Sequence, residues 1–93
     1  MTKKAVKFNI NGTVQGVFFR QFCKDKATEL GLKGYVRNLE TSNVEVLVEG
    51  EKDKIEEMYT ILKKGPPHAQ IRDIKPEEKK WSGEFKDFSI MRF

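Results

Sequence analysis

The fold is decided by residues 4–30, which read KAVKFNINGTVQGVFFRQFCKDKATEL. Between residues 4 and 10 apolar side chains take every second position, which is the period of a half-buried strand. From Arg20 to Leu30 the period becomes helical, and residues 11–19, which hold two glycines, are expected to form the loop between them. The inward side chains would be Val6, Phe8 and Ile10 on the strand, and Phe19, Phe22, Cys23, Ala27 and Leu30 on the helix.

The rest of the chain continues this alternation of strands and helices. Residues 32–39 and 44–49 are rich in aromatic and β-branched side chains and are separated by a short polar segment, which predicts a hairpin. A second helix is expected from about Glu51 to Lys64, because acidic residues open it, lysines close it and Gly-Pro-Pro follows it. The remaining segments are a predicted strand at about 69–74, polar irregular chain at 75–84, and a short strand from Phe85 towards the end.

The order of these elements predicts the fold class. It is strand, helix, strand, strand, helix, strand (βαββαβ), with a short extra strand at the C-terminus. Right-handed crossovers place both helices on one face of a single sheet. We therefore expect an α+β protein, a two-layer ferredoxin-like sandwich with a mostly antiparallel sheet. Residues 1–93 are expected to form one domain, because chains divide only at greater length.

Composition narrows the classes of function. One cysteine and one histidine leave too few ligands for a zinc site, so we expect no metal and no other cofactor. A lone cysteine and an N-terminus without an apolar signal core favour a cytoplasmic protein, which we expect to be a monomer. No apolar run approaches the roughly 20 residues of a membrane span, so no membrane partner is expected. The net charge of +4 favours anionic partners.

Residues 12–20 carry the most informative chemistry. They leave a strand and enter a helix, and a helix start offers backbone N–H groups without partners at the positive end of the dipole. Gly16 allows the backbone to approach a ligand closely, and Arg20 adds a planar charged group that suits two phosphate oxygens. The spacing matches neither a Walker loop nor a dinucleotide-binding motif. The pattern alone leaves two readings open, a phosphate site or an ordinary turn followed by a solvated arginine.

The same segment resembles the phosphate-loop signature of the acylphosphatase family at every defining position. Residues 34–38, Gly-Tyr-Val-Arg-Asn, resemble a second motif of that family, and Gly65-Pro66-Pro67 resembles its link into the fourth strand. The resemblance extends from about Val6 to the C-terminus. One departure is the predicted hairpin turn, where Thr41-Ser42-Asn43 stands in place of the usual Asp-Gly. Asn tolerates a left-handed conformation, so the hairpin is retained and only its turn type stays open.

The resemblance implies hydrolysis of acyl phosphates to a carboxylate and inorganic phosphate. It assigns phosphate binding to Gln15, Gly16, Val17, Phe18, Phe19 and Arg20. It also assigns the attacking water to Asn38, so Arg20 and Asn38 are the predicted catalytic residues. Elementary chemistry agrees, because a carboxylate leaves without a proton. The reaction then needs neutralised phosphoryl charge and a water held in line, which an amide can orient without acting as a base.

Two alternative classes share this order of elements. A catalytically quiet anion-binding domain is compatible with both motifs. An RNA-binding module would need aromatic side chains on the outward positions of its central strands. Those positions hold Lys7, Asn9, Glu45, Leu47 and Glu49, so no nucleic-acid partner is expected. Two residues close in sequence to Arg20 and Asn38 are given structural roles. Cys23 is expected to pack in the core rather than react, and Arg37 is expected to be a solvated charge on the face opposite Asn38.

Overall fold

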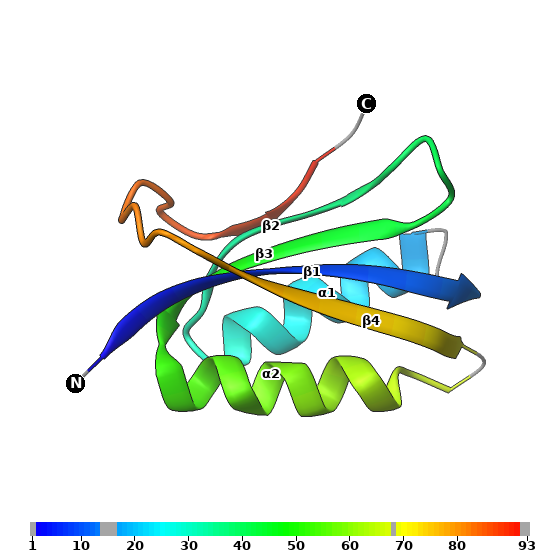
Figure 1. The fold of residues 1–93 in the computed structure, drawn as a ribbon, viewed down its shortest axis with the longest axis horizontal. Helices are drawn as coiled ribbons and strands as arrows, with labels where there is room; N and C mark the ends of the chain where they lie inside the picture. The colour runs from blue at the N-terminus through cyan, green and yellow to red at the C-terminus, as the bar shows by residue number, and fades with distance from the viewer. Residues whose placement is uncertain (1, 14–16, 68, 92–93) are drawn as a thin grey trace.

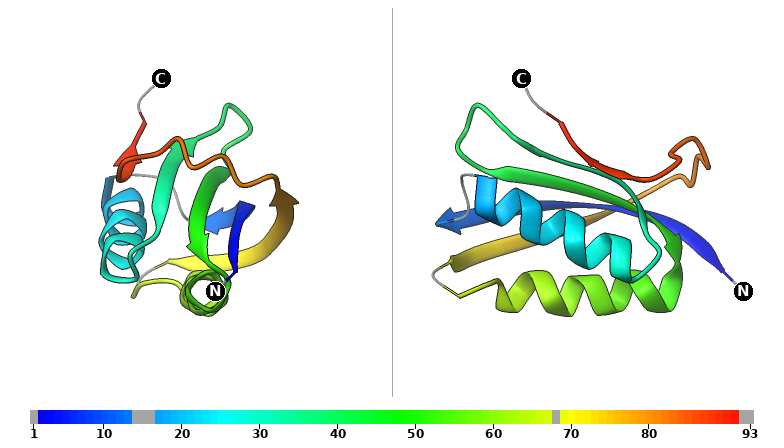
Figure 2. Two further views of the ribbon diagram at one scale, coloured as in Figure 1. Left: turned by 90° about the vertical axis from the view of Figure 1, so that its left-hand side faces the viewer. Right: turned by 180° about the vertical axis from the view of Figure 1, so that it is seen from behind.

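The computed structural model describes residues 2–13, 17–67 and 69–91 and confirms the predicted order of elements. The strands are β1 (Lys3–Thr13), β2 (Lys33–Asn38), β3 (Val44–Glu51), β4 (Gln70–Lys79) and β5 (Phe88–Ile90), and the helices are α1 (Val17–Glu29) and α2 (Lys52–Lys64). The strands form one sheet in the order β4-β1-β3-β2-β5, in which only the β2–β5 pair is parallel. Both helices cover the same face of this sheet (Figures 1 and 2).

The core lies between the sheet and the two helices. β3 contributes Val44, Val46 and Val48, all fully buried, and its pairing with β1 sets Val46 opposite Phe8 and Val44 opposite Ile10. The predicted helical stripe is confirmed, because Phe19, Cys23 and Ala27 are buried while Phe22 and Leu30 pack against the core. Burial of such side chains supplies most of the free energy of folding, about 1.5–3 kcal/mol for each large one. Within the described residues no helix is both long and apolar enough to cross a membrane.

Two predicted segments have wrong boundaries. The expected loop at residues 11–19 is shorter at both ends, because β1 continues to Thr13 and α1 begins at Val17. The extension of β1 comes from pairing with β4, through a β-bulge between Asn11 and Gly12 that apolar periodicity does not register. The expected irregular segment at 75–84 is also wrong over its first half, since β4 runs to Lys79.

The polar end of β4 forms a strand because its backbone pairs with β1, from Lys75 opposite Asn9 to Lys79 opposite Ala5. β4 is an edge strand, and residues 75–79 on it are exposed, so their polar side chains remain in contact with water. Pro76, which lacks a backbone N–H, is tolerated in β4 because one side of an edge strand has no neighbouring strand to accept a hydrogen bond. Residues 75–79 are therefore a strand because their backbone pairs with β1, which is distant in sequence.

The hairpin between β2 and β3 is confirmed, but its left-handed residue is Ser42 rather than Asn43. Ser42 has φ 73°, and its N–H donates to the carbonyl oxygen of Leu39 at 3.1 Å. The N–H of Leu39 in turn donates to the carbonyl oxygen of Asn43 at 2.8 Å. The Asn43 side chain is used differently, because its Nδ2 donates to Oδ1 of Asn9 on β1 at 2.7 Å. This hydrogen bond ties the turn, just before β3, to β1.

Gly34 is the glycine of the second motif, and its position on β2 admits no side chain. Its φ is 140°, and a Cβ there would collide with the carbonyl oxygen of Leu47 on β3. Gly31 provides a contrast, since it has φ 71° at the end of α1, but a Cβ added to it would meet nothing within 4 Å. The first glycine is required by both conformation and contact, and the second by conformation alone.

We expect Gly34→Ala to lower the free energy of unfolding by at least about 3 kcal/mol, because strain and a backbone collision add together. Gly31→Ala should cost only about 1–2 kcal/mol, the strain of a left-handed residue. Urea unfolding of both variants, with m-values compared to confirm the same transition, measures the difference. Equal losses would show that β3 moves aside at Gly34.

Candidate active site

The sheet topology brings both sequence motifs to one end of the molecule. β1 and β2 each pair antiparallel with β3, so their C-terminal ends lie at the same end of the sheet. α1 follows β1 and packs against β2 and β5, and because it begins shortly after β1 ends, its N-terminal turn lies at this end of the sheet. In Figure 1 this end lies on the right, where β1 ends and α1 begins. Arg20 and Asn38, 18 positions apart in sequence, therefore belong to the same end of the fold.

The first turn of α1 offers a site for an anion. The backbone N–H groups at a helix start have no partner within the helix. Residues 17–20 hold no acidic side chain that would neutralise the positive end of the dipole. α2 differs, because Asp53 stands in its first turn and accepts the Lys54 N–H at 3.0 Å. Of the two helix starts, that of α1 is the one left electrostatically favourable for a phosphate.

The predicted phosphate-binding residues take different places. Gln15 and Gly16 lie outside the described residues, and Val17 is the first residue of α1. Phe19 is only 4% exposed and anchors the turn in the core, with its ring 6.2 Å from that of Phe22. Arg20 is half-buried, and Phe18 is 89% exposed. The turn therefore has a buried side that holds it against the sheet and an exposed side that carries a phenylalanine.

Asn38 is the last residue of β2, directly opposite Val44 in the ladder with β3. Alternation along the strand places it on the same face as the fully buried Val36, which is the face that α1 covers. Its Oδ1 atom is buried and has no hydrogen-bond partner among the residues that the structure describes. A buried carbonyl oxygen without a partner costs about 1–3 kcal/mol, and native proteins rarely contain one. A bound water or ligand group that donates a hydrogen bond would satisfy this atom.

Arg37 points away from Asn38, as predicted, but it is not a solvated charge. Its Nε donates to Oε2 of Glu45 at 2.8 Å, and the hydroxyl of Tyr35 donates to the same oxygen at 2.8 Å. Lys7 approaches the other carboxylate oxygen at 3.7 Å. The sequence pattern missed this cluster because its members come from three strands that only the sheet brings together.

The cluster shifts the pKa values of Glu45, Tyr35 and Arg37, and the hydrogen bond to Glu45 raises that of Arg37. Burial acts to raise the pKa of Glu45, but the hydrogen bonds from Arg37 and Tyr35 outweigh it and hold that pKa below its usual range. Burial, with the hydrogen bond to Glu45, raises the pKa of Tyr35 to about 12. Glu45 therefore stays charged and Tyr35 stays neutral across the physiological range. The cluster stabilises the outer face of the sheet and lies on the opposite face from Asn38.

The outer face is further closed by the segment that follows β4. The buried carboxylate of Glu49 accepts hydrogen bonds from the N–H of Ser82 at 2.9 Å, the N–H of Gly83 at 3.0 Å and the hydroxyl of Ser82 at 2.8 Å. Phe85 from the same segment lies 6.0 Å from the ring of Tyr35. Two buried carboxylates and this covering segment make the face unsuited to stacking RNA bases, which need open aromatic positions.

Two other candidate features are structural. Cys23 is fully buried, and burial raises the pKa of its thiol, which confirms its predicted place in the core rather than as a nucleophile. Across the described ranges, 2–13, 17–67 and 69–91, no three His, Cys, Asp or Glu side chains gather closely enough to hold a metal ion.

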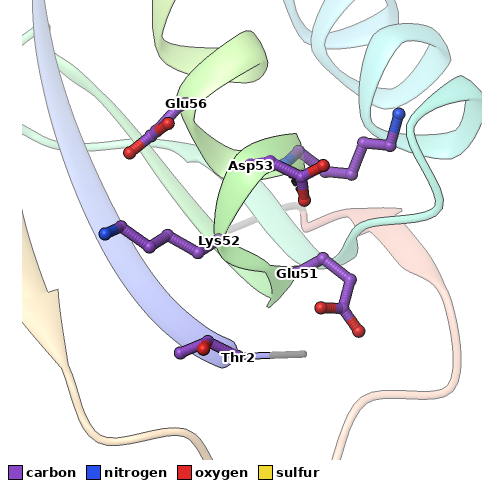
Figure 3. A pocket seen from close by; sticks show the side chains of 6 residues that line it. Thr2, Glu51, Lys52, Asp53 and Glu56 are labelled. Atoms are coloured by element: carbon purple, nitrogen blue, oxygen red, sulfur yellow. Dashed lines mark hydrogen bonds between the residues drawn. The ribbon is translucent and has the colours of Figure 1, made fainter.

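A hollow of about 500 Å³ lies away from the two motifs, where β3 passes into α2. Its lining residues are Thr2, Glu51, Lys52, Asp53, Lys54 and Glu56. Figure 3 shows that their charged ends do not converge on one point, since the side chains of Lys52 and Glu51 extend in opposite directions. With carboxylates on three of its residues, this hollow is a poor site for a phosphate.

Comparison with known proteins gives a consistent result. The family model described as Acylphosphatase matches residues 6–90. An acylphosphatase of Aliivibrio fischeri is 46% identical over 90 residues, which cover 97% of this chain and 99% of that protein. The structure of an acylphosphatase from Coxiella burnetii is similar with a TM-score of 0.89 and 36% identity, over 96% of this chain and 93% of the other. The crystal structure of an acylphosphatase from Bacillus subtilis is similar with a TM-score of 0.90 and 30% identity, over 96% of this chain and 99% of the other.

We expect the Glu45 cluster to make the fold sensitive to acid. A lowered carboxyl pKa contributes stability above the pKa of the unfolded chain, near 4.3, and that contribution is lost as the pH falls through the folded value. The free energy of unfolding should therefore decline between about pH 5 and 3, and Glu45→Gln should flatten this decline. Denaturant unfolding across this pH range measures it. Glu57→Gln, at an exposed carboxylate on α2, is the control, and an equal effect of both variants would contradict the assignment.

Proposed function

The chain belongs to the acylphosphatase family, and from this we propose that it hydrolyses the carboxyl–phosphate bond of acyl phosphates, releasing a carboxylate and inorganic phosphate. The observation that supports the mechanism best is the buried Oδ1 of Asn38, which has no hydrogen-bond partner among the described residues and lies on the face of the sheet that α1 covers. We further propose that residues 1–93 act as one domain, as a cytoplasmic monomer without a nucleic-acid or membrane partner. The single sheet, the lone cysteine and the occupied outer face support this view.

The substrate phosphate is held at the start of α1. The backbone N–H groups of the segment from Gln15 to Arg20 (Gln15, Gly16, Val17, Phe18, Phe19 and Arg20) donate to its oxygens. The guanidinium of Arg20 supplies a full positive charge and can donate to two phosphate oxygens at once. These donors act most strongly in the transition state, when charge is spread over the phosphoryl oxygens. Phosphate, as product, binds the same donors and competes with substrate.

Asn38 holds the attacking water. Its Oδ1 accepts one O–H of the water, and this orients a lone pair of the water oxygen towards phosphorus. The new P–O bond forms as the bond to the carboxylate oxygen breaks on the opposite side, and the carboxylate takes the bonding electrons. The water proton passes to a phosphate oxygen or to solvent. Because a carboxylate is stable as an anion above about pH 5, no general acid is needed for its departure.

We expect Arg20→Ala to lower kcat/KM for benzoyl phosphate by at least about a thousandfold and to weaken inhibition by inorganic phosphate in parallel. The reason is the loss of the one full positive charge assigned to the phosphate. Rates measured with and without phosphate test both effects. Lys24→Ala, which removes an exposed charge one turn later on α1, should leave both within about twofold. Wild-type sensitivity to phosphate in Arg20→Ala would refute the role of Arg20.

For Asn38→Ala we expect kcat to fall about a hundredfold with little change in KM, since an oriented water matters chiefly in the transition state. Stability should not fall, because the substitution removes a buried acceptor that has no protein partner among the described residues. Asn43→Ala at the same hairpin provides the contrast. It breaks the 2.7 Å hydrogen bond to Asn9, so it should lower stability by about 1 kcal/mol and change kcat much less. Unchanged kcat in Asn38→Ala would place the water elsewhere.

A further inference from the structure

We infer that the side chain of Phe18 binds the acyl group of the substrate and makes the protein select acyl phosphates with an apolar, and especially an aromatic, acyl group. This inference rests on the proposed function, because it uses the positions assigned there to the phosphate and the water. It assigns to the side chain of Phe18 a role separate from that of its backbone N–H, which contacts the phosphate.

The exposure of Phe18 is the first observation. It is 89% exposed, whereas Phe8, Phe19 and Phe88 are at most 4% exposed. Among the described residues the other large apolar side chain that is exposed is Trp81, at 45%. A single exposed apolar side chain is common on protein surfaces and proves nothing by itself. The inference therefore depends on where Phe18 lies, in the first turn of α1 beside the proposed phosphate site.

The geometry of in-line attack defines on which side the acyl group must lie. The water and the leaving carboxylate stand on opposite sides of phosphorus. Asn38, which holds the water, is on the face of the sheet that α1 covers, so the attack comes from the sheet side. The acyl group therefore leaves phosphorus on the side away from the sheet, where the first turn of α1 faces solvent.

Phe18 is on that solvent side of the first turn. Its neighbour Phe19 is buried in the core, and consecutive side chains on a helix point in directions about 100° apart. Phe18 accordingly lies on a different face from Phe19 and Cys23, which both point into the core. Side chains of a helix lean towards its N-terminus, so the ring of Phe18 leans towards the bound phosphate. An acyl group leaving phosphorus away from the sheet would meet this ring.

The expected contact is with a flat apolar group. An aromatic acyl group such as benzoyl can stack on the exposed ring or meet its edge, whereas an acetyl group offers one methyl. The contact buries apolar surface of both partners, and the exposed ring needs no rearrangement to make it. Selectivity between acyl groups then comes from Phe18 and is separate from phosphate binding, which uses the backbone of the turn and Arg20.

The test compares benzoyl phosphate with acetyl phosphate. We expect Phe18→Ala to lower the ratio of kcat/KM for benzoyl over acetyl phosphate roughly tenfold, and Phe18→Leu to retain part of the selectivity. Inhibition by inorganic phosphate should change less than about twofold in Phe18→Ala, because the backbone N–H remains. Trp81→Ala, at the other exposed aromatic residue, is the matched control and should leave the ratio unchanged.

An unchanged ratio in Phe18→Ala would overturn the inference, as would a loss of phosphate inhibition as large as the loss of benzoyl phosphate hydrolysis, which would mean that the turn itself is disturbed. Either result leaves the proposed function intact as long as the wild-type protein hydrolyses both substrates. Failure of the wild-type protein to hydrolyse either acyl phosphate would instead reject the proposed function, and the inference with it.

Discussion

The antiparallel pairing of β3 with both β1 and β2 is the constraint on which the rest of the structure depends. It forces the two flanking strands to run in the same direction and to end at the same end of the sheet. A helix that begins shortly after β1 ends then starts at that same end and packs against β2. The three buried valines of β3 hold this arrangement by filling the layer between sheet and helices. A slip of one residue in either pairing would turn Val44, Val46 and Val48 towards solvent, so the register is strongly specified.

Buried polar groups divide the sheet into a structural face and a face that carries the site. On the outer face the buried carboxylates of Glu45 and Glu49 are well supplied with donors from neighbouring strands and from the segment after β4. On the helix-covered face the Oδ1 atom of Asn38 has no donor from the described residues. Stability alone would favour an apolar side chain at this position. An amide whose buried acceptor has no partner in the described part of the chain is typical of a group that serves a ligand.

Local patterns predicted the helices, the central strands and the inward-facing residues, because each of these depends on periodicity within a few residues. They failed where distant pairing decided the outcome. The polar residues at the end of β4 form a strand only because the backbone of β1 is available beside them. Arg37 is similar, since its partner Glu45 lies on the neighbouring strand and its ion pair cannot be read from the chain order. Ser42 rather than Asn43 took the left-handed conformation, because hydrogen bonds across the hairpin select the residue that turns.

For the site, the sequence by itself determined the residue types and the family. The two motifs were recognisable as linear strings, and the family model that matches residues 6–90 agrees with that interpretation. Only the tertiary structure decided what surrounds each residue: it leaves the Oδ1 atom of Asn38 without a partner among the described residues, and it leaves Phe18 in solvent. The reason is physical. A chemical type is a property of one residue, whereas burial and hydrogen-bond satisfaction depend on what the register of three strands and the packing of one helix place around it.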